Sequence, residues 1–429
     1  MLVFALYSIV DRIFIGRAVG SVGIGAVSLT FPIFMILMAV GMLIGTGTGT
    51  LISIRMGEGK TREAEKLAGN AFFLLIMIGV IGTFLGLTYI DRILYTFGAS
   101  ANTFPYARDF MHVIFWGITF NFIAMGMNNI IRAEGNPKIA MKTMLIGAFL
   151  NIILNPIFIF GLNMGVRGSA LATVISNIAT SSWVMFHFTI GKSNLKLRLK
   201  NLKVNLKTMM PAFAIGISPF SMQIAASVVS VIANRSLLYY GGDTAVSAMG
   251  IISAIAMFIF LPIMGINHGA QPIIGFNYGA HEFSRVKKAV LLTISAASVI
   301  SFSGFLVVFF APEFLIRMFD KNSVELVKIG APGMRTFLLL IPLLGFQAVG
   351  TNFFQAIGKA KVSIFLSLLR QVLLLIPFLL IFPRYWGLDG IWLASPASDL
   401  IAFITTAGFL MAELKRLDGN QAQKDAAAA

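Results

Sequence analysis

Four motifs in the first half of the chain recur in the second half, in the same order and at nearly the same distance. Each later copy begins 222 or 223 residues after the earlier one: 11–29 and 234–252, 56–66 and 278–288, 133–138 and 356–361, and 165–168 and 387–390. This regular order predicts two copies of one ancestral half. In an apolar chain, two homologous halves are typical of a transporter that moves one half against the other.

The chain is too apolar for a soluble protein. Its residues are 57% hydrophobic and 12% charged, with a mean hydropathy of +0.87, whereas about 25% of residues in a soluble domain are charged. The apolar runs 71–90, 113–131 and 290–310 approach or exceed the roughly 20 residues that cross a bilayer as a helix. Because backbone groups in lipid must bond within their own segment, these continuous runs predict an all-α integral membrane protein.

The composition also excludes several classes of function. Basic residues on cytoplasmic loops explain the formal charge of +16, and no basic face interleaved with aromatic residues predicts nucleic-acid binding. The chain has no cysteine, and its four histidines do not have the spacing of metal ligands. It has no phosphate-binding loop for ATP. We therefore expect neither an enzyme nor a resident cofactor.

Hydropathy and turn signals predict twelve transmembrane helices in two homologous six-helix bundles. The spans lie near 1–16, 24–54, 67–90, 110–131, 139–161, 168–190, 208–238, 245–277, 288–310, 330–356, 361–382 and 388–411. The predicted domains are an N-lobe with helices one to six (1–191), a linker (192–207), a C-lobe with helices seven to twelve (208–412) and a tail (413–429). The first helix is shortened, since only about ten residues precede Asp11.

Basic residues gather in the connections that follow the even-numbered spans. The positive-inside rule places these connections, and both termini, in the cytoplasm, so we expect a multi-pass protein of a bacterial or archaeal cytoplasmic (inner) membrane. The segment 191–207 contains basic residues and no acidic residue. Its apolar spacing allows a short amphipathic helix on anionic headgroups, which makes membrane lipid an expected partner.

Several segments together resemble a known family. They are 8–33, the glycine-rich 41–59, RAEGNPK at 132–138 and 151–173. Over nearly the whole chain they are similar to the MATE (multidrug and toxic compound extrusion) transporters, and most of all to the MepA-like bacterial branch. The resemblance implies secondary active efflux of amphipathic, often cationic compounds, driven by H⁺ or Na⁺, by a membrane protein linked to antibiotic and xenobiotic resistance. We expect it to act as a monomer.

Four polar residues are candidates for the ion-coupling site. Asp11 is an ionisable residue inside a predicted span, where such residues are costly and usually functional, although pairing with a neighbouring arginine is an alternative. At about 1.5 Å per residue, Asn151, Asn155 and Thr173 fall at a similar depth, and the two asparagines share one helix face. Pro156 follows directly, and a proline there can free a carbonyl for a cation.

The resemblance implies the same site, with one departure. Asp11, Asn151 and Thr173 match the family's N-lobe cation or proton site, whereas an aspartate is usual at the position of Asn155. One carboxylate with amide and hydroxyl oxygens can hold a single Na⁺ ion, or the carboxylate alone can carry a proton. Both coupling ions therefore stay open.

Two further sets of residues lie within spans. Five polar residues are candidates for a substrate cleft, although each is also typical of a hydrogen bond between helices: Gln223, His268, Gln271, Gln347 and Asn352. Arg370 and Asp399 are predicted near the bilayer midplane on consecutive helices. Because an isolated charge is costly there, they should form a buried pair that acts either as a brace or as a second proton or substrate site.

Three other functions fit less well. A lipid-linked oligosaccharide flippase of the same superfamily would favour a basic cavity for pyrophosphate, and Arg370 is the one basic residue that is clearly mid-span. A membrane-embedded enzyme would need catalytic side chains at one depth. A channel would need a filter-like motif, and neither pattern is present.

Overall fold

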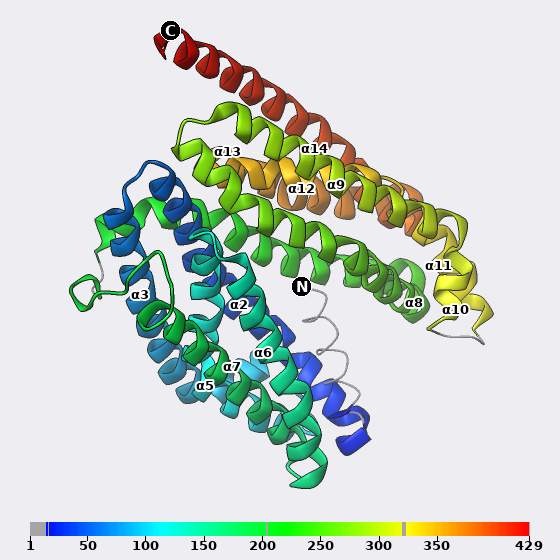
Figure 1. The fold of residues 1–429 in the computed structure, drawn as a ribbon. Coiled ribbons are helices and arrows are strands. Elements are labelled where there is room, and N and C mark those ends of the chain that lie inside the picture. Colours follow the sequence, from blue (N-terminus) through cyan, green and yellow to red (C-terminus); the bar gives the residue numbers. More distant parts are fainter. Residues whose placement is uncertain (1–13, 16, 203–204, 320–322, 429) are drawn as a thin grey trace. The chain divides into compact units, whose positions relative to one another are not determined.

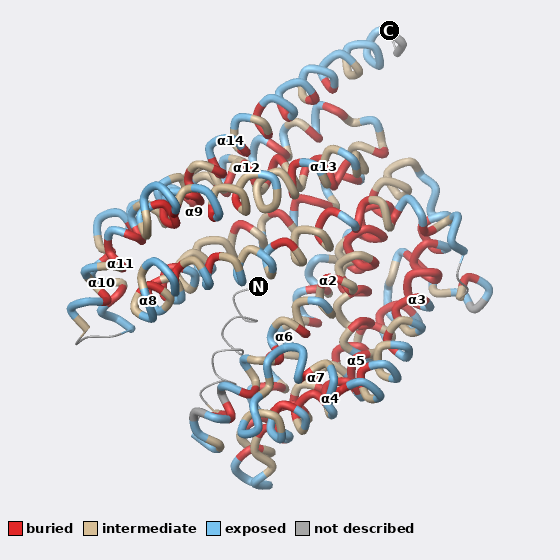
Figure 2. Tube along the Cα trace, turned by 180° about the vertical axis from the view of Figure 1, so that it is seen from behind, coloured by how far each residue is buried: buried red, intermediate tan, exposed pale blue. Residues whose placement is uncertain are grey.

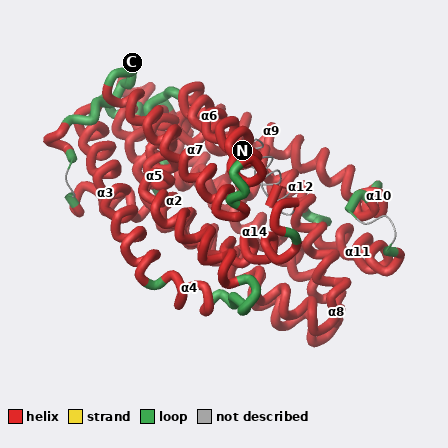
Figure 3. Tube along the Cα trace, turned by 90° about the horizontal axis from the view of Figure 1, so that it is seen from below, coloured by secondary structure: helices red, strands yellow, loops and turns green. Residues whose placement is uncertain are grey.

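The structure is a computed structural model that describes residues 14, 15, 17–202, 205–319 and 323–428. The described residues form helices and the turns between them (Figure 3). They divide into a first unit, Met1–Phe220, and a second unit, Ser221–Ala429. This boundary lies inside a helix, and the four domain ranges expected from the sequence stay a prediction. The first predicted span, with Asp11, lies outside the described residues apart from two positions.

The helices of the first unit coincide with predicted spans two to six. They are α2 (Ser21–Gly57), α3 (Thr61–Thr88), α4 (Ile90–Thr96), α5 (Phe104–Ala133), α6 (Pro137–Pro156), the π-helix η1 (Ile157–Gly161), α7 (Gly165–Thr189) and the 3-10 turn η2 (Leu199–Asn201). Helix α5 is central, because it packs against α2, α3 and α7 (Figure 1). The short helix α4 is an addition that hydropathy did not predict.

The second unit contains two helices that each run through two predicted spans. Its elements are α8 (Leu206–Gly279, which begins in the first unit), α9 (Phe283–Phe310), α10 (Pro312–Arg317), α11 (Val324–Phe337), α12 (Ile341–Ala356), α13 (Ala360–Leu368), the π-helix η3 (Leu369–Leu375) and α14 (Ile376–Ala428). Helices α8 and α14 each continue through one residue with non-helical backbone, Gly242 and Gly387. The predicted tenth span is the pair α11 and α12, bent by 46°.

The helices have the length and surface of membrane spans. Eight described helices are long and apolar enough to cross a bilayer, or nine if the bent pair counts as one span. This number is below twelve because α8 and the segment from α13 to α14 each count once and the first span is outside the described residues. Large apolar side chains such as Phe84, Phe149 and Phe302 are exposed, and Figure 2 shows exposed positions along the helices. Lipid favours such a surface, whereas a soluble monomer avoids it.

The internal repeat is also present in the backbone. The glycines that open the GVRG and GLDG motifs, Gly165 and Gly387, have φ values of 53° and 54°. Gly59 has a φ of 75°, and at its repeat position His281 has a φ of 56°, which is uncommon for a residue with a Cβ. The two halves therefore share turn geometry even where the residue type has changed.

The segment 191–207 was predicted as an amphipathic helix, and this prediction is wrong for its described residues. Only η2 is helical there. The backbone N–H of Lys196 donates to Oε1 of Glu65 at 3.2 Å, and that of Asn205 donates to Oδ1 of Asn70 at 2.7 Å. Leu195 is buried in protein. Side chains of α3 thus satisfy the backbone of this segment, which removes the need for helical hydrogen bonds.

Candidate functional site

Helix α6 of the first unit ends in an irregular turn. Pro156 closes α6 and has no N–H to donate to the carbonyl of Ile152, one turn earlier. The next five residues form η1. Helix α7 comes close to this turn, because a Cβ built on Gly168 would lie 2.9 Å from the carbonyl carbon of Phe158. The end of α6 and the start of α7 therefore pack with their backbones in close approach.

Three of the four expected coupling residues contact one another just before this turn. Asn155 Nδ2 donates to Asn151 Oδ1 at 2.9 Å, and Asn151 Nδ2 donates to Thr173 Oγ1 at 3.2 Å. The side chains of Asn151 and Asn155 are buried, with 3% and 1% of each residue exposed, and Thr173 is half-buried. We call these three residues the polar cluster. Asp11, the carboxylate expected beside them, lies outside the described residues.

The polar cluster contains an acceptor without a donor. Within the described part of the chain, Oδ1 of Asn155 is buried and has no hydrogen-bond partner. Ser176 Oγ, one turn beyond Thr173 on α7, is also buried and unpaired there. An unsatisfied buried polar group costs about 1–3 kcal/mol, which a cation or a protonated donor at the site would relieve. Neutral oxygens of this kind suit Na⁺, and they equally suit a carboxylic acid that donates its proton.

The five cleft candidates are spread over α8 and α12 of the second unit. Asn352 Nδ2 donates to the carbonyl of Asn267 at 3.2 Å and so links α12 to α8. Gln271 and Gln347 are buried, and Oε1 of Gln347 has no partner within the described residues. His268 and Gln223 are half-buried, and both interact with other groups. Asn352 therefore has a bracing contact, and a substrate-binding role for these residues stays a prediction.

Arg370 and Asp399 contact each other in the second unit. Arg370 lies in η3 and its Nε donates to Asp399 Oδ1 at 2.5 Å, while Ser395 Oγ donates to Oδ2 at 3.4 Å. The carboxylate side chain is 4% exposed and the guanidinium side chain 24% exposed. The two charges thus neutralise each other inside the second unit, and the contact by itself does not decide between a brace and a functional site.

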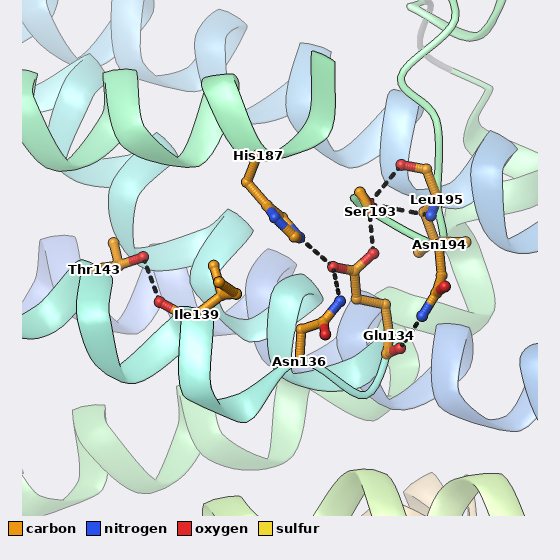
Figure 4. A network of polar contacts seen from close by, with 8 residues as sticks. All are labelled: Glu134, Asn136, Ile139, Thr143, His187, Ser193, Asn194 and Leu195. Carbon is orange, nitrogen blue, oxygen red and sulfur yellow. Dashed lines mark hydrogen bonds and ion pairs between the residues drawn. The ribbon is translucent and has the colours of Figure 1, made fainter. Parts of the chain in front are cut away.

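A buried carboxylate that the sequence reasoning missed holds the α5–α6 turn of the first unit (Figure 4). Glu134 Oε1 contacts His187 Nε2 and accepts from Asn136 Nδ2 at 2.9 Å. Its Oε2 accepts from Ser193 Oγ at 2.5 Å, and its carbonyl accepts from Asn194 Nδ2 at 3.0 Å. We call this set the Glu134 network. A lone acid in a basic connection was the available signal, since His187 by itself looked like one scattered histidine.

The chain also matches known proteins over most of its length. The MatE family model matches residues 1–157 and 220–381, which is more than half of the chain. The chain belongs to the MATE family. This family consists of membrane transporters and not of enzymes.

Curated relatives and solved structures agree with this membership. The multidrug export proteins MepA of Staphylococcus haemolyticus (strain JCSC1435) and Staphylococcus aureus (strain MSSA476) are 30% and 31% identical to this MATE chain over 404 residues, covering 94% of it and 88% of each relative. The MATE multidrug transporter DinF-BH, solved in complex with a rhodamine dye, has 39% identity and a TM-score of 0.90, covering 96% of this chain and 92% of that one. An outward-facing multidrug resistance MATE transporter of the MOP superfamily has 26% identity and a TM-score of 0.91, covering 97% and 93%.

Proposed function

We propose that this MATE protein is a secondary active multidrug exporter. It exports amphipathic, often cationic compounds in exchange for H⁺ or Na⁺, through alternating access of its two lobes. Two relatives named as multidrug export proteins match 94% of the chain, and a related transporter binds a rhodamine dye in its solved structure. The match over nearly full length supports a common activity more strongly than a match to one motif would.

The coupling site consists of Asp11 and the polar cluster. The observation that carries this assignment is the buried Oδ1 of Asn155, which has no donor among the described residues. Asn151 and Thr173 are hydrogen-bonded in series with Asn155, so their oxygens are held in place before an ion arrives. Asp11 supplies the negative charge that selects a cation. Binding of H⁺ or Na⁺ neutralises that charge, and the neutral and charged states favour different arrangements of the N-lobe helices.

The protein acts in the cytoplasmic membrane of a bacterium as a multi-pass monomer with both termini inside. The distribution of basic residues supports this orientation. Export of toxic cations from such a cell would contribute to antibiotic and xenobiotic resistance. In this orientation, an inward gradient of H⁺ or Na⁺ supplies the free energy for outward transport.

Transport into and out of proteoliposomes tests the proposal, with a fluorescent cationic rhodamine as the substrate. We expect rhodamine efflux to require an imposed pH gradient, an imposed Na⁺ gradient, or both when each is applied separately. Asp11→Asn should reduce coupled efflux by about tenfold or more, because the asparagine cannot be neutralised by a cation. Size-exclusion chromatography of the variant checks that folding is intact. Wild-type efflux by Asp11→Asn at every pH and Na⁺ concentration would refute the coupling site, and retention of the dye by the wild-type protein under both gradients would refute the function.

A further inference from the structure

The second unit contains a site at the repeat position of the polar cluster. The spacing of 222 residues that relates Gly165 to Gly387 also relates Thr173 to Ser395. Gly168 likewise corresponds to Gly390. A Cβ on Gly390 would overlap the carbonyl of Phe382, much as a Cβ on Gly168 would crowd the carbonyl of Phe158. The two helix pairs are therefore packed alike.

Each helix pair also carries one polar link next to a π-helix. In the first unit Asn151, before η1, contacts Thr173 on α7. In the second unit Arg370, inside η3, contacts Asp399 on α14 beside Ser395. The first link is made of neutral groups and leaves an acceptor unsatisfied. The second link contains a full positive and a full negative charge.

We propose that the Arg370 guanidinium is a tethered cation that permanently occupies a cation site formed by the Asp399 carboxylate and the Ser395 hydroxyl. Both carboxylate oxygens are engaged, Oδ1 by Arg370 and Oδ2 by Ser395, and the carboxylate is almost completely buried. The arginine reaches it from a more exposed position, as a mobile ion would. An arginine stays protonated at any physiological pH, so this charge cannot leave the site.

The tethered cation explains why the two repeats differ in charge. A buried carboxylate requires a positive partner, because an isolated charge at this depth is expensive. In the second unit a side chain provides that partner, so the site neither takes up nor releases an ion during transport. If the guanidinium is removed and the carboxylate kept, the site should accept a free monovalent cation, and Na⁺ is the natural probe because it prefers oxygen ligands. This inference depends only on residues of the second unit and not on the coupling site proposed for the first.

Sodium-dependent thermal stability of purified protein at pH 8 tests the inference. All variants carry Asp11→Asn, so that a sodium effect cannot come from the first unit. Arg370→Gln removes the guanidinium and leaves an amide oxygen as a further ligand. We expect 100 mM NaCl to raise its melting temperature by about 3 °C relative to the same concentration of choline chloride. Arg370→Lys, which keeps a tethered cation, and the double variant Arg370→Gln/Asp399→Asn, which lacks the carboxylate, should show no difference between the two salts.

Folding of the single variant is itself a readout. If Arg370→Gln is aggregated in choline chloride, we expect NaCl to restore a monodisperse peak in size-exclusion chromatography. A variant that behaves identically in both salts, or that aggregates in both, would overturn the tethered cation and leave the pair as a brace. An equal sodium response in the double variant would also overturn it, because the carboxylate would then not be the ligand. None of these results depends on drug efflux, so they are separate from the test of the proposed function.

Discussion

The two repeats keep the same turns but use their glycines differently. In the first unit, α2 crosses the beginning of α8 with a glycine on each side, since a Cβ on Gly47 would overlap the carbonyl of Ala212 and one on Gly216 the carbonyl of Leu43. The repeat position of Gly47 is Gly269, where a Cβ would meet nothing within 4 Å. Duplication therefore preserved the residue but not its contact, and the same glycine is required in one repeat and dispensable in the other.

The turns that follow α5 and α12 show a second difference. In the first unit this turn contains Glu134, whose network includes Ser193 and Asn194 beyond the end of α7. At the repeat position of Glu134, the second unit has Ile357, which is buried in an apolar cluster with Phe353 and Leu410. The turn itself folds with either residue. The polar version is present where a linker has to be held, which indicates that the network serves the linker and not the turn.

The largest expected effect is that of adding one methyl group at the glycine crossing. Gly216→Ala should destabilise the protein by about 3 kcal/mol, because backbone cannot move aside as a side chain can. Gly269→Ala is the matched control and should change stability by less than about 0.5 kcal/mol. Thermal unfolding of both variants in the same detergent measures the difference. Equal effects at the two positions would contradict the contrast between the repeats.

Removal of the Glu134 carboxylate should have the next largest effect. Glu134→Ala leaves His187, Asn136 and Ser193 without their shared acceptor, at a cost of about 2 kcal/mol. It should also release the segment after α7, so trypsin should cleave at Lys192 or Lys196 several times faster than in the wild type. Ile357→Val, which shortens the corresponding apolar side chain by one methyl group, serves as the control and should leave linker cleavage unchanged. Wild-type cleavage in Glu134→Ala would show that the network does not hold the linker.

A carboxylate introduced into the polar cluster should make the first repeat more like the second. Asn155→Asp adds a negative charge beside Asn151 and Thr173, and we expect it to tighten Na⁺ binding by about tenfold, or about 1.4 kcal/mol. Isothermal titration calorimetry with NaCl at pH 8 compares the variant with the wild type. Asn155→Gln, which changes size without charge, is the control. Unchanged affinity in Asn155→Asp would mean that the polar cluster is not a cation site.

The smallest expected effect concerns two surface turns at repeat positions. Burial acts to raise the pKa of Glu58, but hydrogen bonds from Lys60 at 2.8 Å and Arg55 at 2.7 Å outweigh it and lower that pKa. A lowered folded-state pKa adds stability above the ordinary glutamate pKa, and this stability is lost as the pH falls through the folded-state value. Glu58→Gln should therefore remove a few tenths of a kcal/mol of the stability difference between pH 6 and pH 3, since solvent screens the pair.

The second turn has the opposite arrangement of charge. Glu282 takes the repeat position of Lys60, and a hydrogen bond from Lys424 at 2.7 Å lowers its pKa. Glu282→Gln should flatten the acid side of the stability curve in the same direction as Glu58→Gln. Thermal melts between pH 3 and pH 6 measure both. A steeper dependence on pH in either variant would contradict the sign.

Sequence patterns predicted the parts of this fold that depend on local or neighbouring segments. Long apolar runs located α3 and α9, and counting residues along consecutive helices brought Arg370 and Asp399 to one depth. The patterns failed where a distant partner decides the structure. Glu134 and His187 are 53 residues apart, and no local periodicity relates them. The segment 191–207 did not become an amphipathic helix, because α3 offers hydrogen bonds that no hydropathy pattern records.

The attachment of the linker also limits how much slack the chain has between its units. A free segment of 16 residues would have an end-to-end distance of about 20–25 Å and would let its ends drift apart or together at little cost. Here Glu134, Glu65 and Asn70 hold that segment, and the helix that follows is clamped to α2 at Gly216 before it enters the second unit. Extra residues inserted into the linker would then form a loop on the first unit only. The covalent path between the units is a stretch of α8, which can bend but cannot lengthen.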